Sequence, residues 1–156
     1  MLRRGWFRAG EGRMRVIRWL VLMAMVACGA ARADDAALER FAQNLALRDV
    51  PGFVEAVNSL RAAGRLPQRY VTKDDAERLG WRAGADLCRV APGRAIGGDP
   101  FGNRERRLPA ARGRSWREAD LDFNCGRRNA SRLLWSSDGM IYVTVDHYQT
   151  FREVPR

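Results

Sequence analysis

The chain has 156 residues, and its 28 basic against 18 acidic residues give a formal net charge of +10 with the single histidine neutral. This length is typical of one domain around one hydrophobic core, and the sequence shows no internal repeat of the kind that builds a solenoid. The basic excess favours a polyanionic partner such as a nucleic acid, although net charge alone does not establish a basic patch.

The first 33 residues have the features of a secretory signal peptide. A positive segment, Arg13–Arg18, precedes an almost wholly apolar stretch that ends at Ala27, and Ala31-Arg32-Ala33 offers a small-x-small cleavage site. The apolar stretch is too short to span a bilayer comfortably. We therefore expect cleavage near Ala33 and a secreted or periplasmic protein with no stable membrane association.

Two alternatives for this segment stay open. Translation could begin at Met14, because a positive residue directly before the apolar stretch is the usual layout of a signal peptide. Lipidation at Cys28 is the other, although Met25-Val26-Ala27 makes a poor lipoprotein signature. Removing residues 1–33 takes away seven arginines and one glutamate, which leaves 21 basic and 17 acidic residues and a net charge of +4.

Export also bears on the cysteines. Cys88 and Cys125 remain in the mature chain as an even pair in an oxidising compartment, which predicts a disulfide between them. The sequence has no Cys-x-x-Cys, and one histidine with two distant cysteines is a poor set of zinc ligands. We therefore expect no zinc site.

The N-terminal third of the mature chain has helical periodicity. Asp34–Arg48 is predicted to form an amphipathic helix, which Pro51 interrupts. Phe53–Ala63 resumes the helical spacing, and Gly64 suits the left-handed conformation that follows a helix end. The apolar face of the first predicted helix consists of Leu38, Phe41, Ala42 and Leu45.

A third, short helix is predicted over Lys73–Leu79. Thr72 is a suitable N-cap for it, because its hydroxyl can accept a hydrogen bond from a free backbone N–H of the first turn. Asp74 and Asp75 lie in that first turn, where the helix dipole favours negative charge. Gly80 is expected to end the helix.

Beyond Trp81 the chain changes to short segments separated by glycine and proline turns. Ser137-Asp138-Gly139 is predicted to be a hairpin turn. Gly93–Asp99 lacks the Gly-Lys-Ser/Thr ending and the following helix of a phosphate loop, so we reject that interpretation. Helices followed by closely spaced strands predict an α+β fold, with N-terminal helices packed on one face of a C-terminal antiparallel β-sheet. The predicted strands are Ser115–Leu121, Ser131–Ser136, Met140–Val145 and Phe151–Val154.

Two side chains are notable because each is the only one of its type. His147 follows a strand-like run beside Asp146 and Tyr148, and imidazole is the side chain that ionises closest to neutral pH, so it is a candidate proton donor. The alternative is a solvated imidazole in a loop. Lys73 is the only lysine among 28 basic residues, which indicates that a compact ammonium is needed there, unless it is an incidental surface lysine.

Several short motifs follow one another in a characteristic order: Leu66-Pro67, Tyr70–Lys73, Leu79–Trp81, Val90–Gly93, Ile96–Asp99, Asn103–Glu105, Trp116–Asp120 and Asp146–Phe151. In these motifs the chain closely resembles the small secreted bacterial guanyl-preferring ribonucleases of the barnase type. The resemblance runs from about Val50 to Phe151, and so many segments matched in one order make it highly specific. It implies a microbial ribonuclease domain over residues 49–156.

The resemblance implies cleavage of RNA by general acid–base catalysis to a 2′,3′-cyclic phosphate, which water later opens, with no metal or other cofactor. It implies that Glu118 is the base that takes the ribose 2′-hydroxyl proton and that His147 is the acid that protonates the departing 5′-oxygen. Lys73, Arg128 and Arg132 correspond to the cations that hold the phosphate. Without the resemblance, Glu118 would be interpreted as a solvated glutamate of a strand.

The resemblance also places guanine recognition in the loop from Phe101 to Glu105. The Glu105 carboxylate would accept hydrogen bonds from the N1–H and N2–H edge of guanine, a donor pair that adenine does not present. Asn103 and Arg104 would supply loop backbone, and Phe101 and Arg104 stacking or shape. The full implied substrate-binding set is Phe101, Asn103, Arg104, Glu105, Tyr148 and Asp99.

Some positions depart from the usual pattern. Gly102 stands where a serine is common, and Arg127 where an aromatic residue is expected, so these two positions bear on substrate preference rather than on activity. The helix predicted over residues 34–48 has no clear counterpart in the family core. It is either an added structural helix or a pro-segment that is removed after export.

Three functions agree with these observations. The leading one is a secreted, monomeric endoribonuclease that acts on single-stranded RNA. A catalytically silent RNA-binding module on the same fold is disfavoured because Glu118 and His147 are both present. An exported antibacterial toxin would share the chemistry and differ only in its delivery. A producing cell would need a small acidic barstar-like inhibitor in its cytoplasm.

Overall fold

The computed structural model describes residues 33–156, so the predicted signal peptide, apart from Ala33, lies outside the described residues together with Met14 and Cys28. Ala37–Arg156 form one compact unit, and the fold below is that of this unit. None of the helices in the described part is long and apolar enough to cross a membrane.

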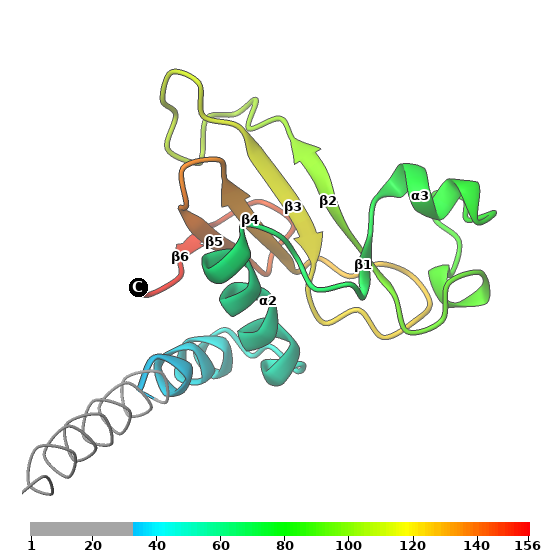
Figure 1. Cartoon of the computed structure of the whole chain (residues 1–156), viewed down its shortest axis with the longest axis horizontal. Coiled ribbons are helices and arrows are strands. Elements are labelled where there is room, and N and C mark those ends of the chain that lie inside the picture. The colour runs from blue at the N-terminus through cyan, green and yellow to red at the C-terminus, as the bar shows by residue number, and fades with distance from the viewer. Residues whose placement is uncertain (1–32) are drawn as a thin grey trace, which may run out of the picture. The chain divides into compact units, whose positions relative to one another are not determined.

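This unit is built on one six-stranded sheet whose strands follow one another in sequence order (Figure 1). The first pair, β1–β2, is parallel, and every later pair is antiparallel. With helices preceding this sheet, the predicted α+β class is confirmed. The strands are β1 (Tyr70–Val71), β2 (Ala95–Phe101), β3 (Trp116–Asp120), β4 (Arg132–Ser136), β5 (Ile141–Thr144) and β6 (Arg152–Glu153).

The helices agree with the predicted ones, with shifted ends. The first helix covers residues 33–44 and ends earlier than predicted, because the chain turns through a positive φ of 55° at Ala46. The second, α2 (Val50–Ala63), begins earlier: Asp49 caps it and Pro51 occupies its first turn, where no backbone N–H is needed. Gly64 has the expected left-handed conformation. The third is α3 (Lys73–Arg78), and a 3₁₀ turn, η1, covers Leu87–Arg89.

Strand β2 is the element that sequence patterns miss. Its two glycines and one proline indicate a turn, but the segment pairs with β1 on one side and with β3 on the other. Gly97 is required there, since a Cβ at this position would lie 2.6 Å from the Tyr70 ring and 2.7 Å from the Ala119 Cβ. The register then shifts between Gly97 and Asp99, where Gly98 forms a bulge with φ of 103°.

The sheet separates two environments because side chains alternate along β3. Ala119 faces α2 and joins the main apolar cluster with Phe53, Val57 and Leu133. Trp116 packs on the opposite face against Leu108 and Leu134, next to aromatic side chains of the β5–β6 region. Glu118 and Asp120 share the parity of Trp116, so the same alternation places two carboxylates on the face away from α2.

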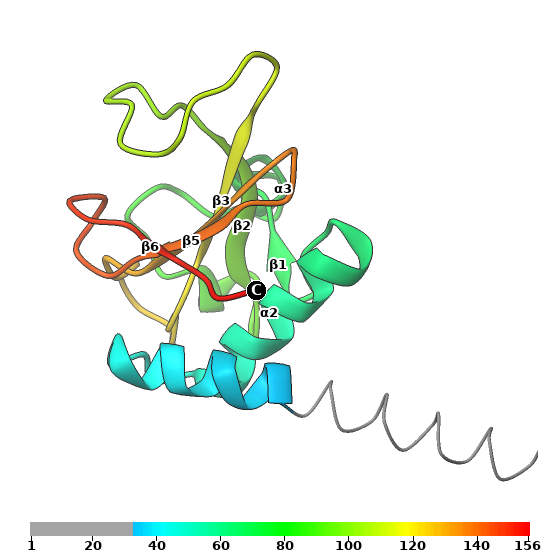
Figure 2. The same ribbon diagram turned by 90° about the vertical axis from the view of Figure 1, so that its left-hand side faces the viewer.

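Residues 38–47 fill part of the main core. Leu38 and Ala42 are fully buried in the same cluster as α2, and the Phe41 ring stacks on Phe53 with 5.9 Å between centroids. Figure 2 shows this helix beside α2. The link that follows is also fixed, because the Asp122 carboxylate accepts hydrogen bonds from the backbone N–H groups of Arg48 and Asp49.

The predicted disulfide between Cys88 and Cys125 is present, with 5.4 Å between the Cα atoms. It joins η1 to the segment between β3 and β4. The Asp86 carboxylate supports the junction by accepting hydrogen bonds from the Cys88 and Gly126 N–H groups. A closed loop of 37 residues corresponds to a stabilisation of about 3–4 kcal/mol through the reduced entropy of the unfolded chain.

We expect Leu38→Ala to lower the free energy of unfolding by about 2–5 kcal/mol, because a fully buried leucine would be replaced by a cavity. Denaturant unfolding of the chain without residues 1–32 is the measurement. Glu39→Ala, at the exposed neighbouring position, is the matched control and should change stability by no more than about 0.5 kcal/mol. Equal stability of the Leu38 variant and the parent would show that this helix is not part of the core.

Candidate active site

Glu118 lies at the centre of the candidate site. It is the middle residue of β3 and is only 7% exposed, on the sheet face away from α2. One carboxylate oxygen, Oε1, lies 3.0 Å from the Lys73 ammonium. The other, Oε2, accepts a hydrogen bond of 2.7 Å from the Tyr148 hydroxyl. A carboxylate predicted as a base is therefore enclosed by one cation and one hydroxyl donor.

These contacts set the protonation of Glu118. Burial on its own raises the pKa of the carboxyl, but the hydrogen bonds from Tyr148 and Lys73 and the charges of Lys73 and Arg128 outweigh burial, so the pKa is lowered overall. Burial and the hydrogen bond to the carboxylate raise the pKa of Tyr148 to about 12. Near neutral pH the pair is therefore an ionised carboxylate and a protonated phenol.

Hydrogen bonds fix the backbone of Lys73, which is the first residue of α3. Thr72 caps the helix as predicted, with its hydroxyl accepting a 3.1 Å hydrogen bond from Asp75 N–H. The Asp99 carboxylate accepts a hydrogen bond from the Lys73 N–H, at 3.2 Å to each oxygen. Asp99 was expected among the substrate-binding residues, and here it fixes the start of the lysine side chain. The bulge at Gly98 turns Asp99 toward this helix end.

Arg128 and Arg132, the two predicted phosphate-binding arginines, both contact Asp120. Arg128 forms two hydrogen bonds with the carboxylate, at 2.7 and 2.6 Å. The Arg132 Nε lies 3.1 Å from the same group. Arg132 is only 4% exposed and also donates to the backbone carbonyls of Asn129 and Ser131, whereas the Arg128 side chain is 22% exposed. Of the two, Arg128 is the one that a ligand can reach directly.

His147 projects from the loop between β5 and β6 in a strained conformation. His147 and Tyr148 both have positive φ angles, 57° and 69°, which residues other than glycine rarely adopt. Asp146 holds the loop: its Oδ1 accepts hydrogen bonds from the Thr144 hydroxyl and from the N–H groups of Gln149 and Thr150. Its Oδ2 accepts a further hydrogen bond of 2.6 Å from the Thr150 hydroxyl. This bond, followed by the one from the Thr150 N–H, lowers the pKa of Asp146 to about 2. The imidazole itself is exposed.

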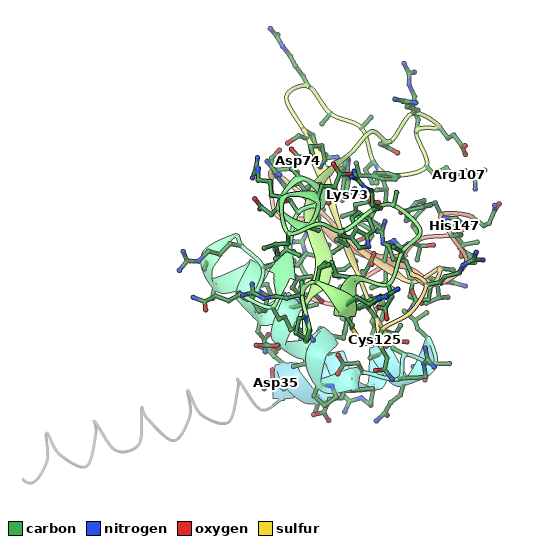
Figure 3. The ribbon with its side chains drawn as sticks, turned by 90° about the vertical axis from the view of Figure 1, so that its right-hand side faces the viewer. Asp35, Lys73, Asp74, Arg107, Cys125 and His147 are labelled. Atoms are coloured by element: carbon green, nitrogen blue, oxygen red, sulfur yellow. A yellow bond between two sulfur atoms is a disulfide. The ribbon has the colours of Figure 1, made fainter. Side chains whose placement is uncertain are left out.

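A pocket of about 320 Å³ joins this loop to the predicted guanine-recognition loop. Figure 3 shows Arg107 and His147 extending from neighbouring loops on one side of the molecule. Phe101 stacks on the Tyr148 ring with 5.3 Å between centroids, so the floor of the pocket adjoins the Glu118 contact. The pocket is lined by Phe101, Gly102, Asn103, Arg104, Glu105, Arg107, His147, Tyr148, Gln149 and Phe151.

Local hydrogen bonds shape the predicted guanine-recognition loop. The Asn103 side chain bonds both the N–H and the carbonyl of Leu108, at 3.1 and 2.9 Å, and closes the loop across five residues. Glu105 is 72% exposed at its side chain and forms an ion pair of 2.7 Å with Arg107. Arg107 also donates to the backbone carbonyls of Tyr148 and Gln149. It thus ties the Glu105 loop to the His147 loop.

The structure therefore brings most of the predicted residues into two adjoining groups. Lys73 and Tyr148 each contact Glu118, and His147 and Glu105 line the neighbouring pocket. Sequence reasoning missed two residues. The spacing of Asp120 from Glu118 gives a usable signal, since alternate residues of a strand share a face, but Arg107 is one of many arginines and has none.

One group of potential metal ligands occurs among the described residues, namely Asp86 with Cys88 and Cys125. The two sulfurs are bonded to each other, so this group offers a single carboxylate and does not match a zinc site.

Comparison with known proteins bears directly on this arrangement. A sequence model of the ribonuclease family matches residues 55–155, a span that contains every candidate residue described above. The chain belongs to the ribonuclease family. Residues 33–44, which form the first helix, lie outside the matched span.

Individual relatives support the assignment. The chain is 57% identical over 91 residues to a ribonuclease of Heyndrickxia coagulans, covering 58% of this chain and 84% of that protein. It has the same identity over 91 residues with ribonucleases of Bacillus intermedius and Bacillus pumilus. The aligned part spans only 56% of the length of each of these two proteins. The resemblance to barnase-type bacterial ribonucleases is thereby confirmed.

We expect Tyr148→Phe to raise the pKa of Glu118, because a hydrogen bond to the charged form of the carboxylate is lost. Titration of the side-chain carboxyl signal by carbon-detected NMR is the measurement. Tyr142→Phe is the control, because the Tyr142 hydroxyl contacts Glu153 rather than the site. An unchanged Glu118 titration in the Tyr148 variant would show that Lys73 and Arg128 alone keep the carboxylate ionised.

Proposed function

We propose that this ribonuclease is an endonuclease that cleaves single-stranded RNA after guanosine, through a 2′,3′-cyclic phosphate that water then opens. The observation that carries the proposal is the buried, ionised Glu118 carboxylate between Lys73 and Tyr148, in a member of the ribonuclease family. Such a group supplies a base and a phosphate-binding cation next to one another, which is what attack by a neighbouring 2′-hydroxyl requires.

In the first step Glu118 takes the proton of the 2′-hydroxyl while the 2′-oxygen forms a bond to phosphorus. A base with a lowered pKa is fully ionised at neutral pH but has less driving force for taking a proton. A substrate phosphate that draws the Lys73 ammonium toward itself would weaken the Lys73–Glu118 ion pair and raise the pKa of Glu118. Substrate binding would thus strengthen the base.

His147 donates the proton to the departing 5′-oxygen as the bond between that oxygen and phosphorus breaks. Its exposed imidazole lines the pocket beside Tyr148, so a leaving group there can reach it. In the second step the roles are exchanged. His147 takes a proton from the attacking water, and Glu118 returns its proton to the 2′-oxygen.

The cations differ in what they can do for the phosphate. Lys73 and Arg128 are partly exposed and can contact phosphate oxygens, where charge accumulates in the transition state. Arg132 is buried and committed to backbone carbonyls, so it acts through its charge and by fixing Asp120. No step of this mechanism uses a metal ion, and we propose that activity persists in EDTA.

Guanine would enter the pocket between the Glu105 and His147 loops. Glu105 would accept the N1–H and N2–H donors, and the aromatic stack of Phe101 on Tyr148 would support the neighbouring surface. Because Glu105 is paired with Arg107 in the free protein, the base must displace or share that ion pair. An exposed ion pair is weak, at about 0–1 kcal/mol, so this exchange is readily met by two charge-assisted hydrogen bonds.

The disulfide is consistent with an oxidising compartment, and we propose that the enzyme is exported and acts as a monomer. A small acidic barstar-like inhibitor would then protect the producing cell from enzyme that has not yet been exported. The net positive charge favours such a partner in the encounter.

We expect Glu118→Gln and His147→Ala each to lower the rate of RNA cleavage by about 10²–10⁴, the range for a general base or acid. Initial rates on a GpN dinucleotide with EDTA present, together with denaturant unfolding to confirm the fold, are the measurements. Glu153→Gln, on β6 and away from the site, is the control for loss of one carboxylate. A fully active His147 variant would overturn the assignment of the acid.

We expect Glu105→Gln to reduce the preference for GpN over ApN by about tenfold to a hundredfold, since an amide presents one acceptor where guanine offers two donors. Cleavage of ApN should change little. Glu153→Gln, which removes an exposed carboxylate away from the pocket, is the control. If Glu105→Gln slowed both substrates equally, Glu105 would shape the loop rather than recognise the base.

A further inference from the structure

A second, larger groove lies on the opposite face of the sheet. It has a volume of about 910 Å³ and begins at the C-terminal end of α2. Beyond that end the sheet extends past the helix (Figures 1 and 2). Leu66, Trp135 and Ile141 form its apolar floor. None of the proposed catalytic or guanine-binding residues lines it, so the proposed mechanism leaves this groove without a role.

Four arginines surround the groove: Arg61, Arg65, Arg94 and Arg117. Three of them are held by neutral backbone carbonyls. Arg61 donates to the Pro155 carbonyl, Arg94 to that of Gln68 at 2.7 Å and Arg117 to that of Gly98 at 2.5 Å.

The charge of these four guanidiniums is not neutralised. Within residues 33–156 none of them forms an ion pair with a carboxylate. Asp75 is the one acidic residue of the groove lining, and it is already paired with Arg78. The groove therefore offers oriented and uncompensated positive charge over an apolar floor.

The bulge in β2 connects this groove to the active site. Gly98 faces the groove, where its carbonyl accepts the hydrogen bond from Arg117. The next residue, Asp99, binds the backbone N–H of Lys73 on the catalytic side. Thr72 likewise lines the groove directly before Lys73. A chain that leaves the Lys73 side of the site can therefore pass over this edge into the groove.

We propose that the groove binds the phosphates of the same single-stranded RNA, at nucleotides distant from the cleaved bond. The guanidiniums that line the groove suit a backbone with one charge per nucleotide, and the apolar floor suits bases or riboses. The proposal rests on RNA being the substrate. It adds an affinity for long strands that a dinucleotide cannot use, because a dinucleotide does not extend beyond the active site.

The test compares two double variants with the same change in net charge. Arg65→Glu with Arg94→Glu alters the groove, and Arg40→Glu with Arg82→Glu alters two exposed positions outside it. Binding of a fluorescent oligodeoxythymidylate is followed by anisotropy over a range of salt concentrations. This probe has no 2′-hydroxyl and no guanine, so it needs neither turnover nor the Glu105 loop. The rates on a GpN dinucleotide and on long RNA are measured alongside.

The groove variant should bind the oligonucleotide about tenfold more weakly at low salt, and the slope of log affinity against log salt should fall by about 1.4, about 0.7 for each lost phosphate contact on a single strand. Its KM for long RNA should rise while its rate on the dinucleotide stays unchanged. Equal weakening in the control variant, or an unchanged salt slope in the groove variant, would overturn the proposal. Absence of dinucleotide cleavage in the parent would refute the proposed function and leave the binding test intact.

Discussion

The enclosure of one carboxylate, that of Glu118, is the constraint on which the active-site face depends. A charge taken out of water inside a sheet is unfavourable unless a counter-charge and hydrogen bonds replace the solvent. Lys73 and Tyr148 replace it here, and they come from distant parts of the chain. The start of α3 and the loop after β5 must therefore converge on the centre of β3. A separate set of hydrogen bonds holds each of them in place.

These hydrogen bonds are made by two carboxylates, Asp99 and Asp146, that have no part in the proposed reaction. Asp99 fixes the backbone of Lys73, and it can do so because the bulge at Gly98 turns the strand. The Asp146 carboxylate accepts hydrogen bonds from hydroxyl and N–H groups of its own loop. These bonds stabilise the two consecutive positive φ angles at His147 and Tyr148. Backbone strain of this kind persists only where the surroundings over-determine it. The strain lies at the proposed acid, where it places the imidazole in the pocket at the expense of backbone stability.

Sequence patterns predicted the parts of this protein that depend on local periodicity. The amphipathic helices, the Thr72 cap, the hairpin at Ser137–Gly139 and the strands β3 to β6 all follow from the spacing of side chains along the chain. Strand β2 could not be predicted in this way, because Gly97 is required by two neighbours, Tyr70 and Ala119, that are remote in sequence, and Gly98 by the positive φ of the bulge. The site residues themselves were predicted from the resemblance to a family. Periodicity cannot show that Glu118 meets Tyr148, because that contact depends on how two loops converge.

The different roles of Lys73 and Arg128 follow from the same geometry. Arg128 holds Asp120 with two parallel hydrogen bonds, a fork that fixes the direction of both groups. Lys73 contacts Glu118 through a single atom at the end of a flexible stem, so its ammonium can transfer from the carboxylate to an entering phosphate with little rearrangement. An arginine at this position would engage the carboxylate with its planar fork and would release it less readily. The chain thus has fixed forks where the site must stay rigid, and one mobile point charge where the proposed reaction requires the charge to move.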